Sequence, residues 1–99
     1  MKIPASVQVG PFRYSVERAK DIRAEHNRNQ QCYGTVNHET HTIRVGEDFP
    51  QERAEAAFWH EALHAIDATM TINLTEKQTT RLAVGLLMFL RDNHLLREE

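Results

Sequence analysis

The hydrophobic period of the sequence changes midway along the chain, and this change constrains the fold more than any other feature. Before it, apolar and polar residues alternate in short runs, as in half-buried strands. After it, residues 51–70 carry a stripe of side chains at every third or fourth position, which is the spacing of one helical face. The stripe comprises Ala54, Phe58, Ala62, Ile66 and Thr69. The sequence therefore predicts an α+β fold.

The strand half contains two predicted pairs. Residues 7–9 and 12–16 alternate around a Gly-Pro turn signal. Residues 33–36 and 41–45 flank a tight turn and are rich in β-branched side chains. Residues 15–29 are polar and charged, which is typical of a solvated strand end, short helix or loop. We expect a small, mostly antiparallel sheet of about three or four strands.

A second helix is predicted after the long one. Thr75 and Gln78 match a capping box, and the helix should run to about residue 93. Gly85 inside it would mark a close approach between the two helices. Its buried face is expected to consist of Leu82, Leu86, Phe89 and Leu90. With 99 residues the chain has room for one domain, spanning residues 1–99.

Composition narrows the partners and the compartment. The formal net charge is −2, and the basic residues are scattered apart from a small group, so no nucleic-acid partner is expected. That group is Arg13, Arg18, Lys20 and Arg23. Cys32 is the only cysteine, which excludes an intramolecular disulfide and indicates a reducing compartment. No signal-peptide pattern is evident, and the longest apolar run, residues 82–90, is too short to cross a membrane. These features indicate a cytoplasmic protein.

The predicted long helix carries an HExxH motif at residues 60–64. His60 and His64 lie one turn apart on one face, so their imidazoles can converge on one tetrahedral Zn²⁺. Glu61 reaches the edge of the same site, where it can accept a proton from a metal-bound water. Zinc is the metal expected from the ligand types, although Fe, Co, Ni or Mn also binds such N/O sites.

A catalytic zinc site has three protein ligands, and the sequence offers two acids for the third. Glu76 stands at the start of the second helix, twelve residues beyond His64. Asp67 shares the helical face of both histidines, where it could be a ligand or could orient an imidazole as a hydrogen-bond acceptor. We favour Glu76 as the ligand and Asp67 as the support. Three further histidines are expected to be exposed: His38, His41 and His94.

The motif and its flanks resemble a known family. The segments FWHEALHAID (58–67), LTE (74–76) and RLAVGL (81–86) are similar to the short HExxH proteins of phages and prophages. Those proteins are similar to ImmA/IrrE-type metallopeptidases of the Glu-ligand (gluzincin) branch of the zincins. The resemblance covers residues 33–93 and implies an HExxH helix behind a small sheet, with the third ligand from the following helix. It implies the roles of four residues: His60, His64 and Glu76 as zinc ligands and Glu61 as the base.

Two features depart from the ImmA/IrrE pattern. The gap between His64 and Glu76 is shorter than usual, which keeps Asp67 open as third ligand. The chain also has no evident further domain for recognising a substrate. The resemblance implies in addition that residues 41–45 form an edge strand, to which a peptide substrate would add as another strand. Candidates for stabilising the oxyanion are Tyr33, His38 and Arg44.

The leading functional hypothesis is a zinc-dependent metallopeptidase that hydrolyses peptide bonds of a specific intracellular protein. Two alternatives stay open. One is a catalytically inactive zincin-like protein that keeps its metal for structure and acts as a protein-interaction or regulatory module. The other is a metal-free regulatory protein in which the two histidines are hydrogen-bonded core residues. Neither the substrate nor the oligomeric state follows from the sequence.

Overall fold

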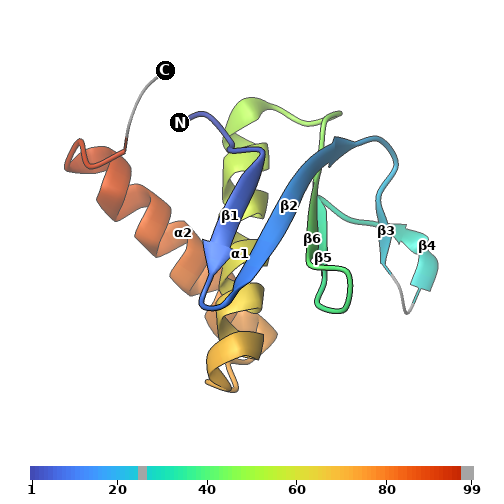
Figure 1. Cartoon of the computed structure of the whole chain (residues 1–99). Coiled ribbons are helices and arrows are strands. Elements are labelled where there is room, and N and C mark those ends of the chain that lie inside the picture. The colour runs from blue at the N-terminus through green and yellow to red at the C-terminus, as the bar shows by residue number, and fades with distance from the viewer. Residues whose placement is uncertain (25–26, 97–99) are drawn as a thin grey trace.

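A computed structural model describes residues 1–24 and 27–96 of the chain (Figure 1). Four strands form one sheet in the order β1-β2-β6-β5, and β3 pairs with β4 apart from it. The elements are β1 (Ser6–Val9), β2 (Phe12–Ala19), β3 (Arg23–Ala24), β4 (Asn27–Gln31), β5 (Gly34–Asn37), β6 (Thr42–Gly46), α1 (Gln51–Met70) and α2 (Glu76–Asp92). The expected α+β architecture is confirmed. The sheet is mixed, because β1–β2 and β5–β6 are antiparallel and β2–β6 is parallel.

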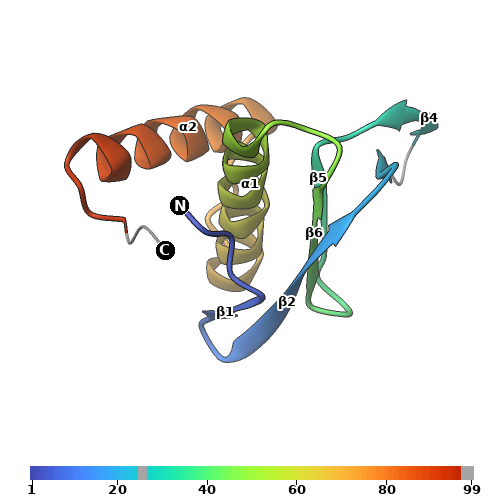
Figure 2. The ribbon, with the colours of Figure 1, turned by 90° about the horizontal axis from the view of Figure 1, so that it is seen from above.

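The core lies between one face of the sheet and α1, which covers that face (Figure 2). Side chains alternate across the strands, so Ile43 and Val45 of β6 are fully buried while Arg44 between them is exposed. Tyr14 of β2 is buried on the same side, 2% exposed. The helix contributes small residues and one large ring: Ala54, Ala57, Phe58 and Ala65. Alanine lets the backbone of α1 approach the sheet closely.

The buried face of α2 differs from the expected one. Leu82 and Phe89 are 49% and 60% exposed, and the buried side chains are instead Thr79, Ala83 and Leu87. Gly85 does not mark a close approach to α1 either, because a Cβ built there would have no atom within 4 Å. The prediction was wrong because α2 is apolar over a wide arc, and small residues suit a close contact with α1 better than the largest ones.

Two of the expected strand positions also needed correction. Residues 41–45 do not form an edge strand, because β6 lies between β2 and β5; the edge beside β6 is β5. The parallel pairing of β2 with β6 causes this, and local sequence periodicity carries no signal for such a distant pairing. The polar stretch 15–29 holds the second half of β2, then β3 and β4, with residues 25–26 outside the described part.

Two local predictions held. Thr75 caps α2 by accepting a hydrogen bond from the Gln78 backbone, and the Gln78 side chain accepts one from the Thr75 backbone in return. The stripe of α1 is buried at Ala54, Phe58 and Ala62, although Ile66 near its end is 38% exposed. Within the described residues, neither helix has the length and apolar character needed to span a membrane.

Candidate metal centre

His60 and His64 face each other from successive turns of α1. Their Nε2 atoms are 3.0 Å apart, and their ring planes are inclined by 72°. Both side chains are largely buried, with 19% and 25% exposure. The helical spacing of four residues is what stacks the two imidazoles on one side of the helix.

Glu76, the first residue of α2, completes a triangle of ligand atoms. Its Oε1 lies 2.6 Å from Nε2 of His60, and its Oε2 lies 3.1 Å from Nε2 of His64. A tetrahedral zinc ion with bonds of about 2.0–2.1 Å separates its ligand atoms by about 3.3 Å. The distances from His64 to His60 and to Glu76 are within a few tenths of an ångström of this value, and the His60–Glu76 distance is about 0.7 Å shorter than it. Together they lie close enough to hold a metal ion.

Asp67 lies one turn beyond His64 and acts on the connection between the helices. Its two carboxylate oxygens accept hydrogen bonds from the backbone N–H groups of Asn73 and Leu74, at 2.7 and 3.1 Å. That connection holds Thr71 and Asn73 in left-handed backbone conformations, with φ of 54° and 68°. Asp67 is therefore outside the ligand group and instead fixes the turn that delivers Glu76.

Thr80 contacts the other ring nitrogen of His60, and the sequence analysis missed it. Its Oγ1 is 3.4 Å from Nδ1 of His60. A metal-ligating histidine usually has a hydrogen-bond partner on the nitrogen that does not bind the metal, because this fixes the ring and its tautomer. The available signal was spacing: Thr80 is four residues after Glu76 and so lies on the same face of α2.

Glu61 is the most buried acid in this part of the molecule, with 8% exposure. Burial, and secondly the negative charge of Glu76, raise its pKa from 4.5 to about 7. Its side chain packs beside Gly34 at the start of β5. A Cβ on Gly34 would lie 2.9 Å from the Arg44 carbonyl oxygen and 3.2 Å from Cγ of Glu61. Gly34, a second residue that sequence reasoning missed, thus leaves the space that Glu61 occupies.

A cavity of about 380 Å³ opens beside these groups. Its polar lining includes His60, Glu61, Glu76 and Thr80, and its other walls come from the start of β5 and from α1 and α2. Tyr33 stands at this cavity, with the Arg53 guanidinium 4.7 Å above its ring. Tyr33 is thus the one oxyanion candidate at the cavity, and Arg53 is a cation there that was not foreseen.

The remaining candidate residues lie elsewhere. Arg44 is on the outer face of the sheet, 3.8 Å from Glu17. Nδ1 of His38 is 3.3 Å from the Tyr14 hydroxyl, and the His41 ring packs against Phe12 and Tyr14. His94 follows α2 and is exposed. Among the described residues, none of these three histidines joins the ligand group.

Cys32 lines the same cavity and has the character of a protonated thiol. Burial, and secondly the negative charge of Glu61, raise the pKa of its thiol. A nucleophilic cysteine needs the opposite environment, in which positive charge or a helix N-terminus lowers that pKa. The surroundings of Cys32 therefore do not favour nucleophilic catalysis.

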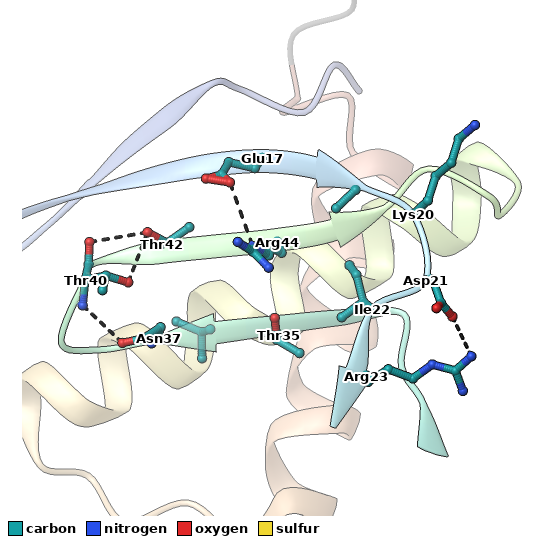
Figure 3. A pocket seen from close by; sticks show the side chains of 12 residues that line it. Glu17, Lys20, Asp21, Ile22, Arg23, Thr35, Asn37, Thr40, Thr42 and Arg44 are labelled. Carbon is teal, nitrogen blue, oxygen red and sulfur yellow. Dashed lines mark hydrogen bonds and ion pairs between the residues drawn. The ribbon is translucent and has the colours of Figure 1, made fainter. Parts of the chain in front are cut away.

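A larger hollow, about 520 Å³, lies on the outer face of the sheet (Figure 3). Its polar groups satisfy one another: Asn37 accepts from the Thr40 backbone, and the Thr40 and Thr42 hydroxyls are 3.2 Å apart. Four of its charged side chains form ion pairs, Arg44 with Glu17 and Arg23 with Asp21. This hollow has the features of a solvated sheet face.

Searches of known family models, of curated proteins and of solved structures found no match to this chain. Its functional assignment therefore depends on the geometry of the site and on the chemistry of its residues.

Proposed function

We propose that this protein is a zincin-like, zinc-dependent metallopeptidase. One observation carries the proposal: three ligand atoms of His60, His64 and Glu76 converge beside a cavity that is also lined by the buried carboxyl of Glu61. Two imidazoles and one carboxylate are a ligand set of catalytic zinc sites, which leave one position for water or substrate. The carboxylate of Glu76 is 71% exposed, so the ligand group is open to solvent on that side.

The donor set fits Zn²⁺, with His60, His64 and Glu76 as its ligands. A bound zinc ion supplies Lewis acidity, which polarises a carbonyl oxygen and lowers the pKa of a bound water to about 7. Glu61 accepts the proton of the attacking water and later donates it to the leaving amine. In the metal-free protein the pKa of Glu61 is raised to about 7, and a zinc ion beside it would lower this pKa and favour the carboxylate form that accepts the proton.

The substrate in this proposal is an extended peptide of an intracellular protein. β5 is an edge strand, and its first residue, Gly34, lines the cavity beside Glu61. A peptide that adds to β5 by backbone hydrogen bonds would pass the cavity with its own carbonyl groups at strand spacing. Tyr33 and Arg53 also line the cavity and would stabilise negative charge on the carbonyl oxygen.

The first experiment is elemental analysis of untagged protein, with His60→Ala as the control. We expect one zinc per chain, lost in the control. Hydrolysis of a peptide library by the zinc-loaded protein is then compared with that of Glu61→Gln. We expect a fall of about 10²- to 10⁴-fold, the usual contribution of a general base. Unchanged hydrolysis by Glu61→Gln with zinc still bound would refute the mechanism.

A non-catalytic zincin-like module is the second candidate. The observation in its favour concerns the oxyanion: two of the three residues considered for this role, His38 and Arg44, lie away from the cavity. In such a module the metal would hold α1 and α2 together for binding a partner protein. Zinc binding without hydrolysis of any library peptide, together with loss of folding on chelation, would favour this candidate.

A further inference from the structure

The outer face of α2 exposes large apolar side chains along its length. Leu82, Met88 and Phe89 are 49%, 48% and 60% exposed, and all lie away from the buried residues Ala83 and Leu87. Figures 1 and 2 show α2 at the margin of the molecule, with its outer side covered by no other described element. Leu82 and Phe89 share one side of this face, and Met88 lies on its other side, beyond Arg81 and Asp92. A group of exposed apolar residues on a helix is a mark of an interaction surface.

Gly85 lies in the middle of this face and adds a second, independent feature. It is exposed, and a Cβ at this position would meet no atom within 4 Å. A glycine inside a helix reduces stability relative to alanine, so it is unfavourable unless the missing side chain is used. At Gly85 the missing side chain allows another helix to approach closely, in the space between the side chains of Leu82 and Phe89.

We propose that the outer face of α2 binds the same face of a second copy of this chain, as an antiparallel helix pair that crosses at Gly85. A two-fold axis that passes between the two glycines places Leu82 of each copy beside Phe89 of the other. The contact is therefore self-complementary, as the interface of a two-fold dimer must be. It adjoins the metal centre, because α2 also carries Glu76, but it contains none of the ligand residues.

The charges on this face support a second copy as the occupant. Arg81 and Asp92 lie eleven positions apart, close to three full helical turns, so both stand on the same side of the helix, between Gly85 and Met88 around its circumference. In an antiparallel pair centred on Gly85, Asp92 lies opposite Gln78, within one turn of Arg81 in the other copy. Opposite charges thus meet twice across the two-fold axis.

The test is sedimentation equilibrium of the full chain over a wide range of concentrations. We expect a reversible monomer–dimer equilibrium for the wild type. Gly85→Leu should raise the dimer dissociation constant about tenfold or more, since it fills the space at the crossing point. The same change should not lower the melting temperature of the dilute monomer, since the position is open there. A wild type that stays monomeric, or a dimer that Gly85→Leu leaves intact, would overturn the proposal.

A matched control and a charge exchange locate the interface. Leu82→Asp should weaken dimerisation about tenfold or more, whereas Ile72→Asp, at a residue 51% exposed outside this face, should not. Arg81→Glu and Asp92→Arg should each weaken it, and the double variant should restore it. Within one chain these residues are about 16 Å apart, beyond the screening length of about 8–10 Å, so restoration requires contact between copies. Additive losses in the double variant would contradict the antiparallel arrangement.

Discussion

Two hollows lined by described residues differ in how their polar groups are satisfied. The larger of these two, on the outer face of the sheet, contains ion pairs and threonine hydroxyl contacts that involve no ligand. The smaller one, beside α1 and α2, brings two imidazoles and a carboxylate to within hydrogen-bond distance and places a second, buried carboxyl beside them. Volume alone would select the wrong hollow.

The comparison shows what distinguishes a reactive site from a solvated surface. Charges on an exposed face cost little, because water or a neighbouring side chain solvates them. Glu61 has lost most of its water, and Glu76 is a nearby like charge, so its ionised form is disfavoured. A bound cation would relieve both effects. Substitutions in the cavity should therefore change metal affinity and pH dependence, whereas matched substitutions in the outer hollow should not.

The largest expected effect is on metal affinity. Glu76→Ala removes the only charged ligand of the proposed centre, and we expect zinc affinity to fall more than 100-fold. Removing the hydrogen-bond partner of a metal ligand typically lowers metal affinity about 10- to 100-fold, and removing a ligand itself should lower it further. The matched control is Glu17→Ala, an acid of the outer hollow, which should leave affinity unchanged. Competition with a chromophoric chelator measures the zinc affinity of both variants. If Glu76→Ala binds zinc as tightly as the wild type, Glu76 is not a ligand.

The second prediction concerns the stability of the metal-free protein. Folding raises the pKa of Glu61 from 4.5 to about 7, so the folded state binds its proton more tightly than the unfolded chain. Stability is therefore lost as pH rises between these two values, by up to about 3 kcal/mol at pH 8. Glu61→Gln cannot ionise and should be more stable than the wild type at pH 8, with the difference disappearing near pH 4.

Urea unfolding in the presence of a chelator, at both pH values, measures this difference. Glu17→Gln serves as the control and should follow the wild type throughout. If Glu61→Gln has the same stability as the wild type at pH 8 as well as at pH 4, Glu61 is well solvated in the metal-free protein.

Local sequence signals predicted several parts of this molecule, and tertiary pairing decided the others. The α1 stripe and the capping box at Thr75 follow from spacing along the chain, whereas spacing left both Glu76 and Asp67 open as partners of the two histidines. The parallel β2–β6 pairing joins strands that are far apart in sequence, and it moved the edge of the sheet to β5. The roles of Gly34 and Thr80 depend on contacts between elements; helical spacing from Glu76 gave a signal for Thr80, and no local period gave one for Gly34.

The third prediction separates the two acids considered as third ligand. Asp67→Ala removes two hydrogen bonds to the backbone of the α1–α2 connection. We expect a loss of about 2 kcal/mol in unfolding free energy, since bonds to a charged acceptor are stronger than neutral ones. One zinc per chain should still bind. Asp48→Ala, an exposed acid between β6 and α1, is the control for removing a charge. Loss of zinc from folded Asp67→Ala would contradict the assignment of Glu76.

The smallest effect is expected at Thr80. Thr80→Val keeps the shape of the side chain but removes the hydroxyl that faces Nδ1 of His60 at 3.4 Å. A hydroxyl can accept from an Nδ1–H group when Nε2 binds metal, and can donate to a bare Nδ1 when Nε2 carries the proton. Thr80→Val should therefore weaken zinc binding about tenfold, which is about 1.4 kcal/mol.

Thr80→Ser retains the hydroxyl and should bind zinc nearly as well as the wild type. The substitution Thr35→Val, a threonine of the outer hollow, should have no effect on zinc binding. Equal affinities for all three variants would mean that His60 is oriented by helix packing alone.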